Sequence, residues 1–75
     1  MERYMNRGGD SNVATYEFGA DFIRVQFNDG SVYLYTNSSA GTANIETMKK
    51  LATSGMGLNS FINTNVRKRY ARKER

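Results

Sequence analysis

Apolar and polar residues alternate in the second quarter of the chain, as they do in a β-strand with one buried face. Within Phe22–Phe27 every second residue from Ile23 is apolar, and Arg24 and Gln26 lie between them. The segments on either side are rich in β-branched and aromatic residues and are separated by glycine-containing turns. The pattern therefore predicts three strands in an antiparallel meander, at Val13–Phe18, Phe22–Phe27 and Val32–Thr36.

The turn between the last two strands has the sequence Asn-Asp-Gly-Ser and allows two registers. A two-residue Asp-Gly turn of type I′ pairs Val25 with Leu34. Tyr33 and Tyr35 then lie on the far face of the sheet beside Arg24, as an exposed aromatic surface.

A three-residue loop gives the opposite result. With Gly30 in a left-handed bulge, Val25 lies opposite Tyr33 and Ile23 lies opposite Tyr35. Both tyrosine rings then face the core. A shift of one residue exchanges the two faces of a strand, and local chemistry leaves both registers open.

The second half of the chain predicts two short helices. Residues 43–54 carry apolar side chains at helical spacing, and Asn59 or Ser60 can cap a second helix that runs to about Arg69. Neither helix is long enough to be stable alone, so both must pack on the sheet. The expected fold is α+β: a three-stranded antiparallel β-meander followed by two short helices packed on one face.

These elements divide the chain into three parts. Residues 1–12 are polar and predict a flexible N-terminal arm. Residues 13–70 form the domain, in which residues 37–42 are a polar loop between sheet and helices. Residues 71–75 predict a basic C-terminal tail.

Charge changes this picture because it is unevenly placed. Residues 67–75 hold six basic residues and one acid, a net charge of +5, whereas the remaining residues hold five basic residues and six acids, a net charge of −1. Such asymmetry suggests contact with a polyanion or a solubilising end.

A polyanion such as RNA fits this charge, because each Lys or Arg that neutralises a phosphate releases counterions. If the second helix continues past Arg69, then Arg69, Arg72 and Lys73 share one stripe. A solvated tail, an acidic protein or a membrane surface are the alternatives. The candidate nucleic-acid-binding residues are Arg67, Lys68, Arg69, Arg72 and Lys73, with Arg24, Tyr33 and Tyr35 where the tyrosines are exposed.

Catalytic chemistry is not expected. The chain has no Cys and no His, which removes the usual nucleophile–base pairs, disulfides and zinc sites. We therefore predict no enzyme activity, no cofactor and no metal. The lack of disulfides favours the cytoplasm, and no run approaches the ~18 apolar residues that predict a membrane span.

The order of motifs resembles that of the KTSC domain, a module found at the C-terminus of some lysyl-tRNA synthetases and as a stand-alone bacterial protein. The similar residues are Ser11-Asn12-Val13, Ile23–Phe27 with Gly30, the central Tyr33-Leu34-Tyr35, and Gly55, Asn59, Phe61 and Ile62. The departure lies between Thr36 and Ile45, where the family often has a proline and this chain has none.

The resemblance implies two expectations. In that family the residue between the two tyrosines is frequently polar, which favours the bulged register with Tyr33 and Tyr35 in the core. RNA binding is the function proposed for the family. The expected partner is therefore RNA or single-stranded nucleic acid, and the alternative is a protein partner or a second copy of the chain. Removal of the tail is expected to abolish binding and leave the fold intact.

Overall fold

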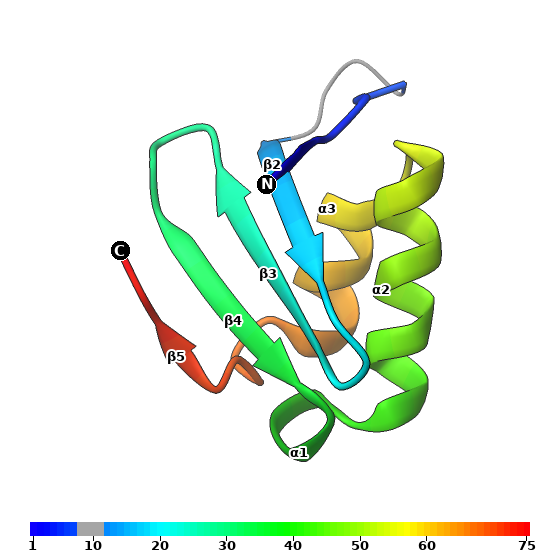
Figure 1. Cartoon of the computed structure of the whole chain (residues 1–75), viewed down its shortest axis with the longest axis vertical. Coiled ribbons are helices and arrows are strands. Elements are labelled where there is room, and N and C mark those ends of the chain that lie inside the picture. Colours follow the sequence, from blue (N-terminus) through cyan, green and yellow to red (C-terminus); the bar gives the residue numbers. More distant parts are fainter. Residues whose placement is uncertain (8–11) are drawn as a thin grey trace.

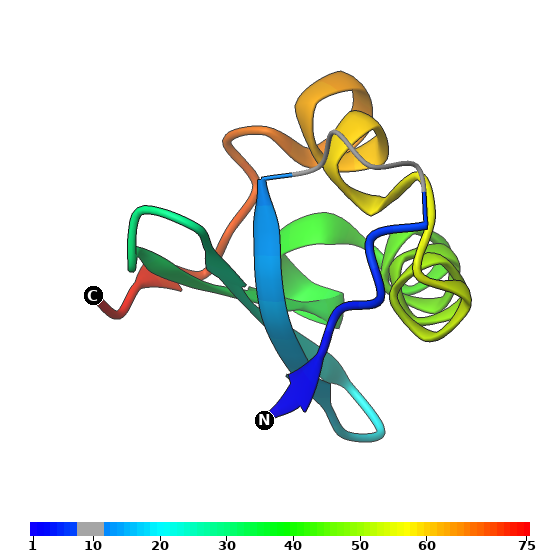
Figure 2. The ribbon, with the colours of Figure 1, turned by 90° about the horizontal axis from the view of Figure 1, so that it is seen from above.

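The computed structural model describes residues 1–7 and 12–75, which form one antiparallel sheet with helices on one face (Figures 1 and 2). The sheet has five strands in the order β1-β2-β3-β4-β5. The strands are β1 (Glu2–Arg3), β2 (Val13–Phe18), β3 (Phe22–Phe27), β4 (Val32–Thr36) and β5 (Arg72–Lys73). The helical elements are α1 (Asn37–Ala40), α2 (Thr42–Ser54), α3 (Leu58–Phe61) and the π-helical segment η1 (Ile62–Val66).

The α+β class is confirmed, and the three predicted strands have the predicted bounds. The count of elements is corrected. Two short strands from the chain ends, β1 and β5, extend the meander at its two edges. The sequence pattern misses them because a strand of two polar residues has no measurable alternation.

The β3–β4 hairpin adopts the bulged register. Val25 pairs with Tyr33 and Ile23 pairs with Tyr35, across a three-residue loop in which Gly30 has a φ of +91°. Tyr35 is 1% exposed, and Tyr33 is half-buried against the core. The type I′ alternative, with both tyrosines on the far face beside Arg24, is wrong.

The core lies between the sheet and the helices. Helix α2 has almost the predicted span, and its inward face places Ile45, Met48 and Ala52 in full burial. No helix among the described residues is both long enough and apolar enough to cross a membrane. The buried core residues are Tyr4, Val13, Ile23, Val25, Tyr35, Ala40, Ile45, Met48, Ala52, Leu58, Ile62 and Val66.

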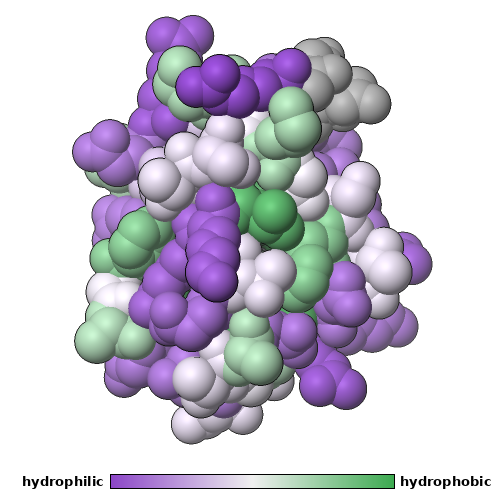
Figure 3. Space-filling model, turned by 90° about the vertical axis from the view of Figure 1, so that its right-hand side faces the viewer, coloured by the Kyte–Doolittle hydropathy of each residue, from purple (hydrophilic) through white to green (hydrophobic). Residues whose placement is uncertain are grey.

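The α2 side of the molecule carries no broad apolar face. Viewed from that side, hydrophobic residues gather in a small central area that hydrophilic residues surround (Figure 3). Charged and aromatic side chains also contact each other: the ammonium group of Lys49 lies 5.7 Å from the ring centre of Phe18. This mixture is typical of an ordinary solvent-facing surface.

The polar segment 37–42 is not a loop throughout, which corrects the prediction. Its first four residues form the single helical turn α1. The hydroxyl of Thr36 accepts a hydrogen bond from the Ser39 N–H, and the Ser39 hydroxyl accepts one from the Thr36 N–H. This reciprocal capping box stabilises the turn. Gly41, with a φ of +95°, then separates α1 from α2.

The second predicted helix is shorter than expected and is built differently. It begins as α3 and ends with η1 at Val66, not near Arg69. Leu58, Ile62 and Val66 are all buried although they are four residues apart. In an α-helix of 3.6 residues per turn this spacing drifts around the axis, and a wider π-helical turn corrects the drift. The Arg69–Arg72–Lys73 helical stripe therefore does not exist.

The start of the chain is also corrected, as far as it is described. Residues 1–12 are predicted as a flexible arm, but β1 pairs with β2 and Tyr4 is 4% exposed. The Tyr4 hydroxyl accepts a hydrogen bond from the Leu58 N–H at 3.2 Å, at the first turn of α3. That N–H lacks an intrahelical partner, so an aromatic ring with a polar tip suits the position. Residues 8–11 of the predicted arm lie outside the described residues.

Two glycines with positive φ test how tightly this N-terminal segment packs. A Cβ added at Gly55 (φ +78°) would lie 2.5 Å from the Cβ of Met5, whereas one added at Gly30 (φ +91°) meets nothing within 4 Å. We expect Gly30→Ala to cost about 1–2 kcal/mol from backbone strain alone. Gly55→Ala should cost about 1–3 kcal/mol more, because the side chain also overpacks. Urea denaturation of both variants measures the difference, and equal losses would show that residues near Met5 do not pack on the domain.

Candidate functional site

The C-terminal residues are part of the sheet, which corrects the prediction of a separate tail over residues 71–75. The Ala71 N–H donates to the Leu34 carbonyl at 2.6 Å, and the Glu74 N–H donates to the Val32 carbonyl at 2.7 Å. The Val32 N–H donates to the Arg75 carbonyl at 3.2 Å. These bonds satisfy the outer edge of β4, which would otherwise be unpaired.

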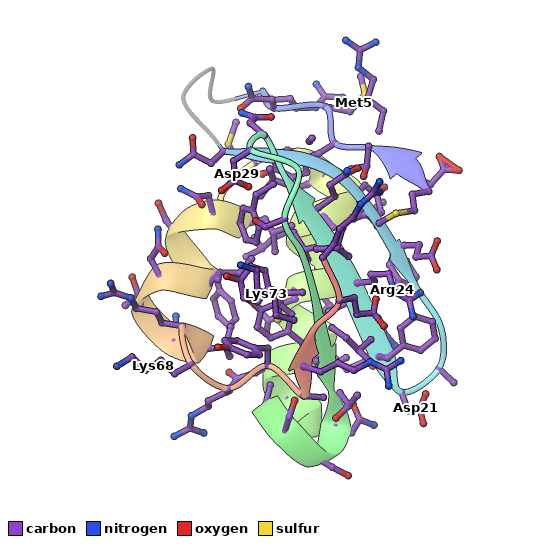
Figure 4. All side chains as sticks on the ribbon, turned by 90° about the vertical axis from the view of Figure 1, so that its left-hand side faces the viewer. Met5, Asp21, Arg24, Asp29, Lys68 and Lys73 are labelled. Atoms are coloured by element: carbon purple, nitrogen blue, oxygen red, sulfur yellow. The ribbon has the colours of Figure 1, made fainter. Side chains whose placement is uncertain are left out.

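Alternation along β5 sends its basic residues to opposite faces. Lys73 pairs with Tyr33, on the face that carries the helices, and Arg72 pairs with Leu34, on the open face. Figure 4 shows Lys73 and Arg24 on opposite sides of the β4–β5 ribbon. The predicted set of binding residues is therefore divided between two surfaces.

Ion pairs form a row on the open face of the sheet. Arg24 bonds to Glu17 and, through Nε, to Glu74 at 2.5 Å, and Arg72 reaches Glu74 at 2.9 Å. Two arginines and two glutamates leave this row neutral. Leu34 lies in the same row of the sheet and is half-buried. Arg24 and Arg72 thus lie on the open face, where both pair with Glu74, although the Arg72 side chain is 67% exposed.

The charges of this row perturb each other. The pKa of Glu74 is lowered, first by its hydrogen bond from Arg24 and then by the one from Arg72. The pKa of Arg24 is raised, mainly by its hydrogen bond to Glu74. Both effects favour the charged forms. Glu74 is the only acid in residues 67–75. Its ion pair with Arg24 links this end of the chain to β3.

A groove lies on the other side of β5, between the β3–β4 hairpin and the α3–η1 helix. It has two parts, of about 550 and 280 Å³, which share Phe27, Tyr33 and Asn63 in their walls. The larger part is lined additionally by Asn12, Asn28, Asp29, Ser31 and Asn59. The smaller part is lined additionally by Tyr35, Ile62, Arg67, Lys68 and Tyr70.

Aromatic rings form the centre of this groove. The Tyr33 ring packs edge-on against Tyr70 at 4.8 Å and against Phe27 at 5.7 Å between ring centres. The Lys73 ammonium group lies 5.8 Å from the Tyr33 ring centre. Tyr35 lies beneath, where burial raises its pKa to about 12, so its hydroxyl stays protonated. The centre is thus an aromatic surface with a cation beside it.

Basic residues stand at the lower end of the groove. Arg67 and Lys68 are exposed, and among the described residues no ion pair joins either of them to an acid. Figure 4 shows Asp29, Lys73 and Lys68 in descending order along this side of the molecule. Arg69 is also exposed but does not line the groove. The structure therefore brings together Arg67, Lys68, Lys73, Tyr33 and Tyr35 from the predicted set.

The amide residues of the groove were missed by the sequence reasoning. Asn59, Asn63 and Arg67 follow one another at a spacing of four, beside the buried stripe of the same helix. The π-helical segment that keeps the buried residues in line keeps this neighbouring stripe in line as well. A polar residue at every fourth position is the signal in the sequence that could have identified this stripe.

Within residues 1–7 and 12–75, no group of three or more Asp or Glu side chains is placed to hold a metal ion. No protein-family model matches the chain, and no curated protein and no solved structure matches it. The resemblance to the KTSC domain therefore stays a prediction.

Glu74 supplies a test of how β5 is held. A carboxyl group with a lowered pKa stabilises the fold above its usual pKa of 4.5, and this contribution is lost as the pH falls through the lowered value. We expect Glu74→Gln to be less stable than the wild type at pH 7, and we expect the difference to shrink between pH 5 and roughly pH 2. Urea midpoints across this range measure it, with hydrogen exchange at Ala71 as a local probe.

Glu46→Gln is the matched control, because Glu46 pairs with Lys49 within α2 and does not contact β5. It should leave the exchange rate of the Ala71 amide unchanged. A stability difference between wild type and Glu74→Gln that stays constant down to pH 2 would contradict the role given to the Glu74 carboxylate.

Proposed function

We propose that the protein is a non-catalytic binding module for single-stranded nucleic acid, mainly RNA. The strand binds in the groove between the β3–β4 hairpin and the α3–η1 helix. The observation that supports this is the aromatic centre of the groove, with Lys73 beside the Tyr33 ring and with Arg67 and Lys68 at one end. Unpaired bases stack on such rings while cations contact the backbone phosphates.

The groove suits a single strand better than a duplex. Its rings lie between a helix and a hairpin loop, with Tyr33 half-buried and Tyr70 37% exposed. A base inside a duplex is stacked on its neighbours and presents no free ring face there. An extended strand can instead place a base against Tyr33 or Tyr70 and its phosphate near Lys68.

A protein partner or a homodimer, the alternative, would suit an exposed sheet face that bears Leu34 or the tyrosines. Tyr33 and Tyr35 face the helices, so the face that bears Leu34 is the open one. In the structure that face carries the ion-pair row of Glu17, Arg24, Arg72 and Glu74. A charged, internally paired row lacks the apolar patch that marks stable interfaces. The groove therefore supports the nucleic-acid proposal more strongly.

Neutralising the basic end of the groove tests this function. We expect wild type to bind a fluorescent oligouridine more weakly as salt rises from roughly 50 to 200 mM. In the double variant Arg67→Gln/Lys68→Gln, the slope of log affinity against log salt should fall by about 1.4, since each phosphate contact to a single strand contributes about 0.7. Fluorescence anisotropy at several salt concentrations gives both slopes, and RNA, single-stranded DNA and duplex DNA are compared.

The control is Arg3→Gln/Lys50→Gln, which has the same net charge but changes residues in β1 and α2 that do not line the groove. Equal slopes for the two double variants would show that binding senses only net charge, and would refute the site. Deletion of residues 67–75 is a poor test, because it also removes β5 and the main-chain bonds to β4.

A further inference from the structure

The upper part of the groove has a different chemistry from the basic end. Its walls carry side-chain amides from Asn12, Asn59 and Asn63 and the carboxylate of Asp29, beside the rings of Phe27 and Tyr33. Amide groups both donate and accept hydrogen bonds, whereas an ionised carboxylate only accepts them. A ring face can stack on the plane of a base while these amide and carboxylate groups form hydrogen bonds with its edge.

The Asp29 carboxylate is held in one orientation. Its Oδ1 accepts hydrogen bonds from the Ser31 N–H at 2.9 Å and from the Ser31 hydroxyl at 2.6 Å. These bonds lower the pKa of Asp29, and Lys73 adds a smaller effect in the same direction. Because Oδ1 is occupied by Ser31, Oδ2 is the oxygen that can accept hydrogen bonds from a ligand.

Guanine is the base whose edge matches this set. Its Watson–Crick edge presents two adjacent donors, N1–H and the N2 amino group, next to the O6 acceptor. Adenine presents one donor beside one acceptor, and cytosine presents one donor beside two acceptors. Uracil presents one donor between two carbonyl oxygens, which a carboxylate would repel. An acceptor from Asp29 together with a donor amide from Asn59 or Asn63 is complementary to guanine.

We propose that the Asp29 end of the groove selects a guanine base within the bound single strand, with Asp29 accepting from the guanine donors and an asparagine amide donating to O6. This inference rests on the proposed function, because it assigns a base to the same groove. Arg67 and Lys68, at the other end, then bind the phosphates of the neighbouring nucleotides.

The experiment compares pentanucleotides that differ only at the central base: UUGUU, UUIUU with inosine, which lacks the N2 amino group, and UUUUU. We expect wild type to bind UUGUU about tenfold more tightly than UUUUU, with UUIUU between them, as a well-formed base-edge contact provides. In Asp29→Asn, which keeps the size of the side chain, this preference should fall to about twofold or less.

Asp21→Asn is the matched control: it removes the same charge from the turn between β2 and β3, and it should keep the full guanine preference. As a second measurement, the side-chain amide signals of Asn59 and Asn63 should shift in NMR spectra when UUGUU is added to wild type.

The outcomes separate the two proposals. Equal affinity of wild type for all three oligonucleotides, or amide signals that stay still, would overturn the guanine inference while the binding function stands. Binding of none of them at 50 mM salt would overturn the proposed function itself. A guanine preference that survives in Asp29→Asn would refute the role of Asp29.

Discussion

The pairing of Val25 with Tyr33 across the β3–β4 hairpin decides where every later side chain of the sheet lies. Side chains alternate with a period of two, so this register directs Tyr33 and Tyr35 to the helix side and Leu34 to the open side. β5 then pairs with β4 and inherits the same alternation. A one-residue shift in the hairpin loop would exchange the faces, and would move the aromatic rings away from α3 and η1.

The same register separates the positive charge into two functions. On the open face, Arg24 and Arg72 are neutralised by Glu17 and Glu74, and this row attaches the chain end to the sheet. On the helix face, Lys73 lies over the Tyr33 ring, and the exposed Arg67 and Lys68 line the groove to which this ring belongs. Among the described residues no ion pair joins Arg67 or Lys68 to an acid, so these two cations keep their attraction for phosphate and the groove retains charge that can serve binding.

The sequence predicts the three central strands to the residue, because apolar and polar residues alternate from Ile23 to Phe27 and glycine-containing turns separate the strands. It predicted the groove only in part. Local pattern and charge predict Tyr33, Lys68 and Arg67 as binding residues. That these side chains line one groove depends on long-range packing. The C-terminal strand could not be foreseen, since two polar residues show no alternation and pair only because β4 offers an open edge. The sequence predicts Asn59 only as a helix cap and assigns no role to Asn63, whereas α3 and η1 place both along the groove.

The way β5 is attached also decides how salt dependence should be interpreted. Salt screens charges, and a basic chain end held only by ion pairs could detach and bind phosphate as a loose arm. Here main-chain hydrogen bonds from Ala71 and Glu74 to β4 hold the segment as well, and they carry no net charge for salt to screen. The side chains of the Arg24–Glu74 pair are only 26% and 20% exposed, so screening reaches them less than it reaches Lys68. Rising salt therefore weakens phosphate contacts in the groove before it releases β5, and the salt slope of binding reports on the groove.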